Sequence, residues 1–181
     1  MTVDKQIEVP ISKNKLILMI LGSIIFIALG FWLIIVRPPV LFFNKADSAP
    51  IDLIVGIAGI LFFGLCFVYI AKKLADNNPG LIINSDGITD NSSGVSAGLI
   101  PWKDINEITK ETIANQDFLV IKVKNPEEYI NRQTGLIKRK AMEMNYKSFG
   151  SPINISSNGL KCNFNELYQI INNSLHSSND E

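Results

Sequence analysis

Two long uncharged stretches constrain this chain more than any other feature of its sequence. Residues 16–36 (LILMILGSIIFIALGFWLIIV) contain no charged side chain, and neither do residues 53–71 (LIVGIAGILFFGLCFVYIA). At about 1.5 Å per residue, helices of these lengths span roughly 31 Å and 28 Å, close to the hydrocarbon core of about 30 Å. We therefore expect a membrane α-hairpin over residues 16–73, with transmembrane helices at about 16–36 and 53–71.

A signal peptide or a pair of buried core helices fits these stretches less well. A cleavable signal peptide normally has a shorter apolar region and a small-residue cleavage site, and no such site follows Val36. Two buried helices of this length would need a larger soluble core than the rest of the chain provides. Lys+Arg and Asp+Glu both total 17, so the net charge is zero, which argues against a bulk nucleic-acid partner.

The distribution of Lys and Arg predicts how the hairpin is oriented. Two basic residues lie in the connection, Arg37 and Lys45, whereas five flank the outer ends of the hairpin: Lys5, Lys13, Lys15, Lys72 and Lys73. By the positive-inside rule, both termini are expected in the cytoplasm. Residues 1–15 are then a cytoplasmic tail of a multi-pass plasma-membrane protein. Glycines in both helices leave assembly through close helix contact open.

The remaining residues, 75–175, are long enough for one cytoplasmic domain, with residues 176–181 as a disordered polar tail. Short β-rich runs bounded by turns predict a mainly β first half, including residues 81–84, 88–90, 107–113 and 118–123. Helices are expected over 126–133 and 136–147, where Ile137, Ala141 and Met144 share helical spacing, followed by strands at 153–156 and 160–162. A last helix is predicted by an apolar stripe: Phe164, Leu167, Tyr168, Ile171 and Leu175.

One part of the soluble region carries a family resemblance. Gly87-Ile88 followed by Leu99-Ile100-Pro101-Trp102-Lys103-Asp104-Ile105 resembles the pattern of glycine, Ile-Pro-Trp and acidic-Ile in bacterial PH-like domains. The whole chain is similar to an uncharacterised family of small bacterial inner-membrane proteins with two N-terminal transmembrane helices. The stretches NPEEYI (125–130) and SPINIS (151–156) recur in that family. The resemblance implies a PH-like small barrel with a C-terminal helix (α+β overall) in the bacterial inner membrane, and it implies no activity.

Residues suited to catalysis or metal binding are few. The only histidine, His176, lies near the C-terminus, while Cys66 lies in the second apolar stretch and Cys162 in the soluble part. This distribution excludes His-based triads and multi-His metal sites, and no phosphate-binding glycine motif occurs. We therefore predict no catalytic residue, no metal site and no cofactor. Free thiols suit a reducing cytoplasm.

One basic cluster stands out in residues 132–147, which contain a single acid, Glu143. Its five members are Arg132, Lys138, Arg139, Lys140 and Lys147. Consecutive positions point to different sides of a helix, so the cluster should wrap around it. Two interpretations stay open: contact with anionic lipid headgroups, or an ordinary solvated helix surface.

Taken together, these patterns favour a membrane-anchored, non-catalytic binding or scaffold module that binds a protein partner or associates with itself. The first alternative is recognition of anionic lipid through the 132–147 cluster. The second is a small membrane enzyme or transport accessory subunit, which would need a pocket lined by convergent polar groups.

Overall fold

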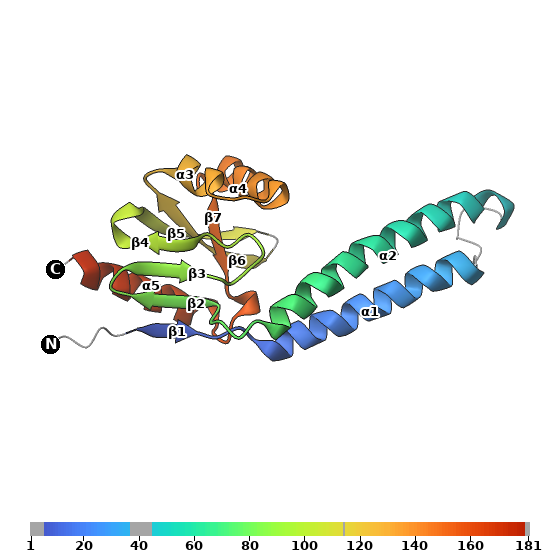
Figure 1. Cartoon of the computed structure of the whole chain (residues 1–181), viewed down its shortest axis with the longest axis horizontal. Coiled ribbons are helices and arrows are strands. Elements are labelled where there is room, and N and C mark those ends of the chain that lie inside the picture. Colours follow the sequence, from blue (N-terminus) through green and yellow to red (C-terminus); the bar gives the residue numbers. More distant parts are fainter. Residues whose placement is uncertain (1–5, 37–44, 114, 180–181) are drawn as a thin grey trace. The chain divides into compact units, whose positions relative to one another are not determined.

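The computed structural model describes residues 6–36, 45–113 and 115–179. The chain divides into two compact units (Figure 1). The soluble unit combines Met1–Ser12 with Asn78–Glu181, and the hairpin unit comprises Lys13–Asn77. The soluble unit is therefore built from chain segments on both sides of the hairpin.

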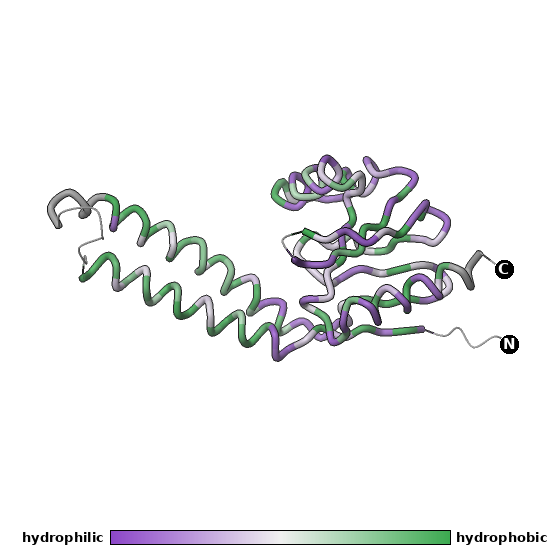
Figure 2. The backbone as a smooth tube through the Cα atoms, turned by 180° about the vertical axis from the view of Figure 1, so that it is seen from behind, coloured by the Kyte–Doolittle hydropathy of each residue, from purple (hydrophilic) through white to green (hydrophobic). Residues whose placement is uncertain are grey.

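Two long helices form the hairpin unit, α1 (Lys13–Val36) and α2 (Lys45–Ala75). Lys13–Val36 and Ile51–Ala75 are long and apolar enough to cross a membrane. Their large apolar side chains point outward, as with Leu18 at 71% and Leu65 at 73% exposure, and this suits lipid rather than water. The expected pair of apolar helices is therefore confirmed (Figure 2). Helix α2 begins inside the expected connection.

Close packing joins α1 to α2 within this unit. The rings of Phe26 and Phe63 stack with their centroids 4.3 Å apart. A Cβ atom added to Gly30 would lie 3.1 Å from the Gly56 carbonyl oxygen, and one added to Gly56 would lie 2.9 Å from the Gly30 carbonyl oxygen. These two glycines thus allow the helix backbones to approach, which is the usual role of small residues between membrane helices.

The first sheet of the soluble unit combines one strand that precedes the hairpin in the sequence with three strands that follow it. Its order is β1 (Ile7–Val9), β2 (Leu81–Asn84), β3 (Gly87–Asp90) and β4 (Gly98–Pro101), all antiparallel. The expected tail of residues 1–15 therefore contains a strand of this unit. Because β1 and β2 are hydrogen-bonded neighbours, both ends of the hairpin must lie on the same side of any membrane that it spans.

The second sheet has the order β5 (Ile105–Ile113), β6 (Gln116–Val123) and β7 (Ile153–Ser156), again antiparallel. A short 3-10 turn, η1 (Trp102–Asp104), separates β4 from β5. Proline at the end of β4 lacks an N–H donor, so the chain leaves the first sheet there. In the described residues the two sheets do not join into the closed small barrel that the resemblance implies, which corrects that expectation. One isolated bridge, Ile11 to Leu160, connects the segments that continue β1 and β7.

The core of the soluble unit lies between the sheets and the C-terminal helix, α5 (Phe164–Asn179), which contacts both β2 and β6. Leu167 and Ile171 are fully buried, as the predicted stripe requires. The helix begins with a capping box in which the backbone N–H of Glu166 donates to Asn163 Oδ1 and that of Asn163 to Glu166 Oε2, each at 2.9 Å. It runs through Asn179, so it includes much of the segment expected as a disordered tail.

Trp102 and the segment 160–162 both lie near the core. Trp102 is 9% exposed and its indole N–H donates to the Asn84 carbonyl oxygen at 2.8 Å, so this side chain is a structural anchor. The expected strand at 160–162 is wrong. After η2 (Ser157–Gly159), an isolated bridge pairs Leu160 with Ile11 and the backbone N–H of Lys161 donates to the Pro10 carbonyl oxygen at 2.9 Å, but no strand forms.

Candidate interaction surface

The insert between β6 and β7 forms two helices, α3 (Pro126–Asn131) and α4 (Leu136–Phe149). Proline at the first position and two following acids favour the start of α3. The Asn125 side chain, at the N-cap position, makes no capping hydrogen bond. A left-handed Gly150 (φ 70°) ends α4. The two helices contact each other and α4 contacts β7 (Figure 1).

Tyr129 fixes α3 to the rest of the soluble unit. Its side chain is fully buried, and its hydroxyl donates to Asp104 Oδ2 at 2.9 Å. Burial, together with this hydrogen bond to a carboxylate, raises the pKa of Tyr129 well above its ordinary value. The phenol therefore stays protonated and serves as a structural donor.

Arg132, the first member of the predicted basic cluster, follows α3 directly. Its guanidinium lies 4.5 Å from the centre of the Tyr129 ring and donates to Glu128 Oε1 at 2.9 Å. It also donates to the Leu99 carbonyl oxygen at 3.2 Å. These contacts hold Arg132 against its own domain.

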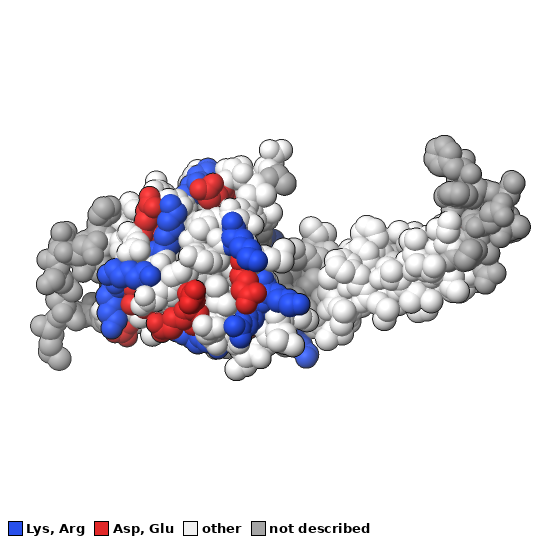
Figure 3. Space-filling model, turned by 90° about the horizontal axis from the view of Figure 1, so that it is seen from above, with Lys and Arg blue, Asp and Glu red and all other residues white. Residues whose placement is uncertain are grey.

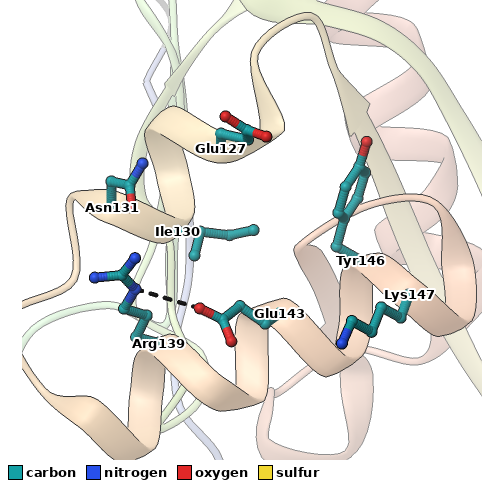
Figure 4. Close-up of a pocket in the computed structure, with 7 residues that line it drawn as sticks. All are labelled: Glu127, Ile130, Asn131, Arg139, Glu143, Tyr146 and Lys147. Atoms are coloured by element: carbon teal, nitrogen blue, oxygen red, sulfur yellow. Dashed lines mark hydrogen bonds and ion pairs between the residues drawn. The ribbon is translucent and has the colours of Figure 1, made fainter.

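A cavity of about 450 Å³ lies between α3 and α4 (Figure 4). Side chains from both helices converge on it: Glu127, Ile130, Asn131, Arg139, Glu143, Tyr146 and Lys147. Within it, Arg139 donates to Glu143 Oε1 at 3.3 Å, so this basic residue is already paired with an acid. These lining residues include no Ser, Cys or His that could act as a nucleophile or a base.

The side of α4 opposite its buried residue carries the most exposed large apolar side chains of the described soluble unit. Ile137 is 88% exposed, Leu136 77% and Met144 67%, whereas Met142 is fully buried. Lys140 and Lys147 are exposed as well. Seen from above, the soluble unit carries charged side chains of both signs (Figure 3). We define the α4 face as these exposed residues: Leu136, Ile137, Lys140, Met144 and Lys147. At about 3.6 residues per turn, the five lie within an arc of about 100°.

The structure thus divides the predicted basic cluster. Arg132 and Arg139 form ion pairs with nearby acids, Glu128 and Glu143, while Lys140 and Lys147 belong to the α4 face. Lys138 lies on another side of the helix, as expected for consecutive positions. In the part of the chain that the structure describes, none of the three lysines forms an ion pair.

The apolar members of the α4 face are the residues that sequence analysis missed. The spacing of Ile137, Ala141 and Met144 predicts a helix, which is confirmed, but it also suggests a core-facing side. Instead, Met142 is the buried residue of α4. The sequence does contain one indication that this side of α4 is exposed: Lys140 and Lys147 share a helical arc with Leu136 and Met144.

Other chemistry is sparse among the described residues. They contain no group of three or more His, Cys, Asp or Glu side chains that could hold a metal ion. Cys66 and Cys162 are half-buried and form no disulfide, and they belong to different units. No protein-family model, curated protein or solved structure matches this chain. The α4 face and the α3–α4 cavity are therefore the two features from which a function can be argued.

Proposed function

We propose that the chain is a non-catalytic binding module anchored in a bacterial inner membrane. In this proposal both termini and a PH-like soluble domain lie in the cytoplasm. The basic residues that flank the outer ends of the hairpin support the orientation. Two antiparallel sheets of four and three strands with a C-terminal helix support the PH-like assignment.

The observation that carries the proposal is the α4 face. Its three apolar side chains are each at least two-thirds exposed, whereas the next most exposed large apolar side chain of the described soluble unit, Leu99, is 44% exposed. A folded domain gains nothing by presenting Leu136, Ile137 and Met144 together to water, so the arrangement favours a surface that is covered in the cell. Both ends of the hairpin join the soluble unit, so in this proposal the unit is anchored to the membrane. A partner bound at the α4 face would then be held at the membrane, or would be the membrane itself.

A photo-crosslinking amino acid at Met144, in the full-length protein in native bacterial membranes, tests the proposal. The same amino acid at Glu111, an exposed residue of β5, is the matched control. A binding module gives a crosslinked product at Met144 that is absent at Glu111, and its mass identifies a lipid, another protein or a second copy. Equal products from both positions, or none, would contradict the proposal.

A second candidate, a small enzyme or transport accessory subunit, is supported by the α3–α4 cavity, where polar groups converge. Its volume of about 450 Å³ is within the range of small-molecule sites. Asn131→Leu would remove a polar group from the cavity and would change no residue of the α4 face, although Lys147 belongs to both. Loss of a cellular activity in Asn131→Leu alone, with Met144 crosslinking unchanged, would favour this candidate.

A further inference from the structure

The composition of the α4 face identifies the kind of partner that covers it. It combines exposed apolar side chains with lysines and contains no acid. Glu143 borders the face, but it is paired with Arg139 at 3.3 Å. Apolar residues beside lysines are typical of helices that lie in a membrane interface, with the lysine stems along the apolar surface and their ammonium groups in the headgroup region.

A protein partner fits this composition less well. Lysine is depleted in the buried centres of protein interfaces, where aromatic residues and arginine are enriched. The arginines of this region, Arg132 and Arg139, are instead occupied by Glu128 and Glu143. A stable protein interface also uses about 20 to 30 residues on each side, whereas the α4 face offers five.

The connections to the hairpin add a third argument. Residues 10–12 join β1 to α1 and residues 76–80 join α2 to β2. If the hairpin spans the bilayer, two such short connections hold the soluble unit near it. The lipid surface is then at a high effective concentration, so a contact that would be weak for a free domain can still form.

We infer that the α4 face docks on the anionic surface of the membrane in which the chain is anchored. Leu136, Ile137 and Met144 enter the headgroup region, while Lys140 and Lys147 contact lipid phosphates. This inference rests on the proposed function and names the partner of its binding surface. It assigns the apolar residues and these two lysines to binding, and Arg132 and Arg139 to the structure of the domain.

The test uses the full-length protein at one chain per lipid nanodisc, which removes self-association. An environment-sensitive fluorescent amino acid replaces Met144, or Glu111 as the control, and spin-labelled lipids quench any label in contact with the bilayer. The discs contain phosphatidylcholine alone or with phosphatidylglycerol. We expect strong quenching at position 144 only in the discs with phosphatidylglycerol, and little quenching at position 111 in either.

Charge variants then identify the residues responsible. Each lysine at an anionic surface favours the docked state by about fivefold, so Lys140→Gln with Lys147→Gln lowers the docking constant about 25-fold. Lys103→Gln with Lys124→Gln removes the same charge from two exposed lysines outside the α4 face and leaves docking unchanged. Raising the salt from about 0.1 M to about 1 M shortens the screening length from about 10 Å to about 3 Å and weakens docking in the parent protein.

The apolar part is tested by Leu136→Asn with Ile137→Asn, which reduces quenching in anionic discs while both lysines remain. Equal quenching at positions 144 and 111, or quenching unaffected by the Lys140 and Lys147 replacements, would overturn the inference. A protein adduct at Met144 in native membranes without quenching in discs would overturn lipid docking and leave the proposed function standing. Absence of both signals would contradict both proposals.

Discussion

Ile7 pairs with Ile83 across the first two strands of the four-stranded sheet, although the entire helical hairpin lies between them in the sequence. The pairing continues beyond the strand, because the backbone N–H of Gly80 donates to the Val9 carbonyl oxygen at 2.9 Å. The soluble unit is therefore discontinuous in sequence. Its first sheet is complete only with residues that precede the two apolar helices.

A fragment that begins at Asn78 should consequently be unstable. It lacks Val9 and Ile11, whose side chains are 4% and 7% exposed in the folded unit. Burying each contributes about 1.5–3 kcal/mol, so the loss is about 3–6 kcal/mol, a large part of the stability of a small domain. Circular dichroism during heating of the fragment should show a broad transition at low temperature.

The control for this fragment is a protein that keeps β1 and lacks only the hairpin. A chain in which a short Gly-Ser linker joins residues 6–12 to residues 78–179 should unfold cooperatively and at a higher temperature. Identical melting of the two proteins would show that β1 contributes nothing to the fold.

The contact of Gly30 with Gly56 predicts the effect of bulk in the hairpin. Leucine at either position meets the facing backbone and the side chain of Ile34 or Ile60, and overpacking of this kind costs about 1–3 kcal/mol. Leucine at Gly22, where a Cβ meets nothing within 4 Å, is the matched control. We expect Gly30→Leu and Gly56→Leu to lower the melting temperature of the detergent-solubilised protein. A comparable loss in Gly22→Leu would argue against the contact.

Gly87 is required by the approach of β4 to β3. Its φ is 149°, and an added Cβ would overlap the Ile100 carbonyl oxygen and lie 2.8 Å from Pro101 Cα. Since backbone atoms cannot yield as a flexible side chain does, we expect Gly87→Ala to reduce stability by about 2–3 kcal/mol or more. Gly98→Ala has an unfavourable φ of 74° but open space, and should cost only about 1 kcal/mol. Chemical denaturation of both variants measures the difference.

The sequence predicts the elements that depend on local patterns. The two apolar helices, the 81–84 and 118–123 strands and the final helix all follow from composition, alternation or a periodic stripe. Strand β1 does not, because three residues beside a long apolar helix carry no distinctive pattern. Its position depends on pairing with β2, a long-range contact that local propensity does not report.

The candidate surface could also be predicted only in part, because some of its features follow from local sequence and others depend on tertiary contacts. A helical wheel separates Lys138, Arg139 and Lys140 without any structure, and the structure places them on different sides of α4. The wheel does not decide whether Met142 or Met144 faces the core, because both lie on apolar sides of the helix. Contact of α4 with β7 and α3 decides it, and this leaves Met144 exposed.

The hydrogen bond from Tyr129 to Asp104 predicts a specific pH dependence. Because the pKa of Tyr129 is raised in the folded state, its stabilising contribution is complete below its unfolded value of about 10. Above that pH the unfolded phenol ionises while the folded one stays protonated, so the contribution falls as the pH rises. Tyr129→Phe removes the hydrogen bond, worth about 1 kcal/mol, and the ionisation together.

At about pH 8 we therefore expect Tyr129→Phe to melt about 4–8 °C below the parent protein, the shift for about 1 kcal/mol in a domain of this size. At about pH 11 the gap should narrow or reverse, because only the parent loses stability through Tyr129. The melting temperatures of both full-length proteins in detergent, measured at the two pH values, give this difference. The two proteins share all other titrating groups, so the effects of those groups cancel in the comparison. A gap that stays constant with pH would show that the phenol at Tyr129 ionises in the folded protein as readily as in the unfolded chain.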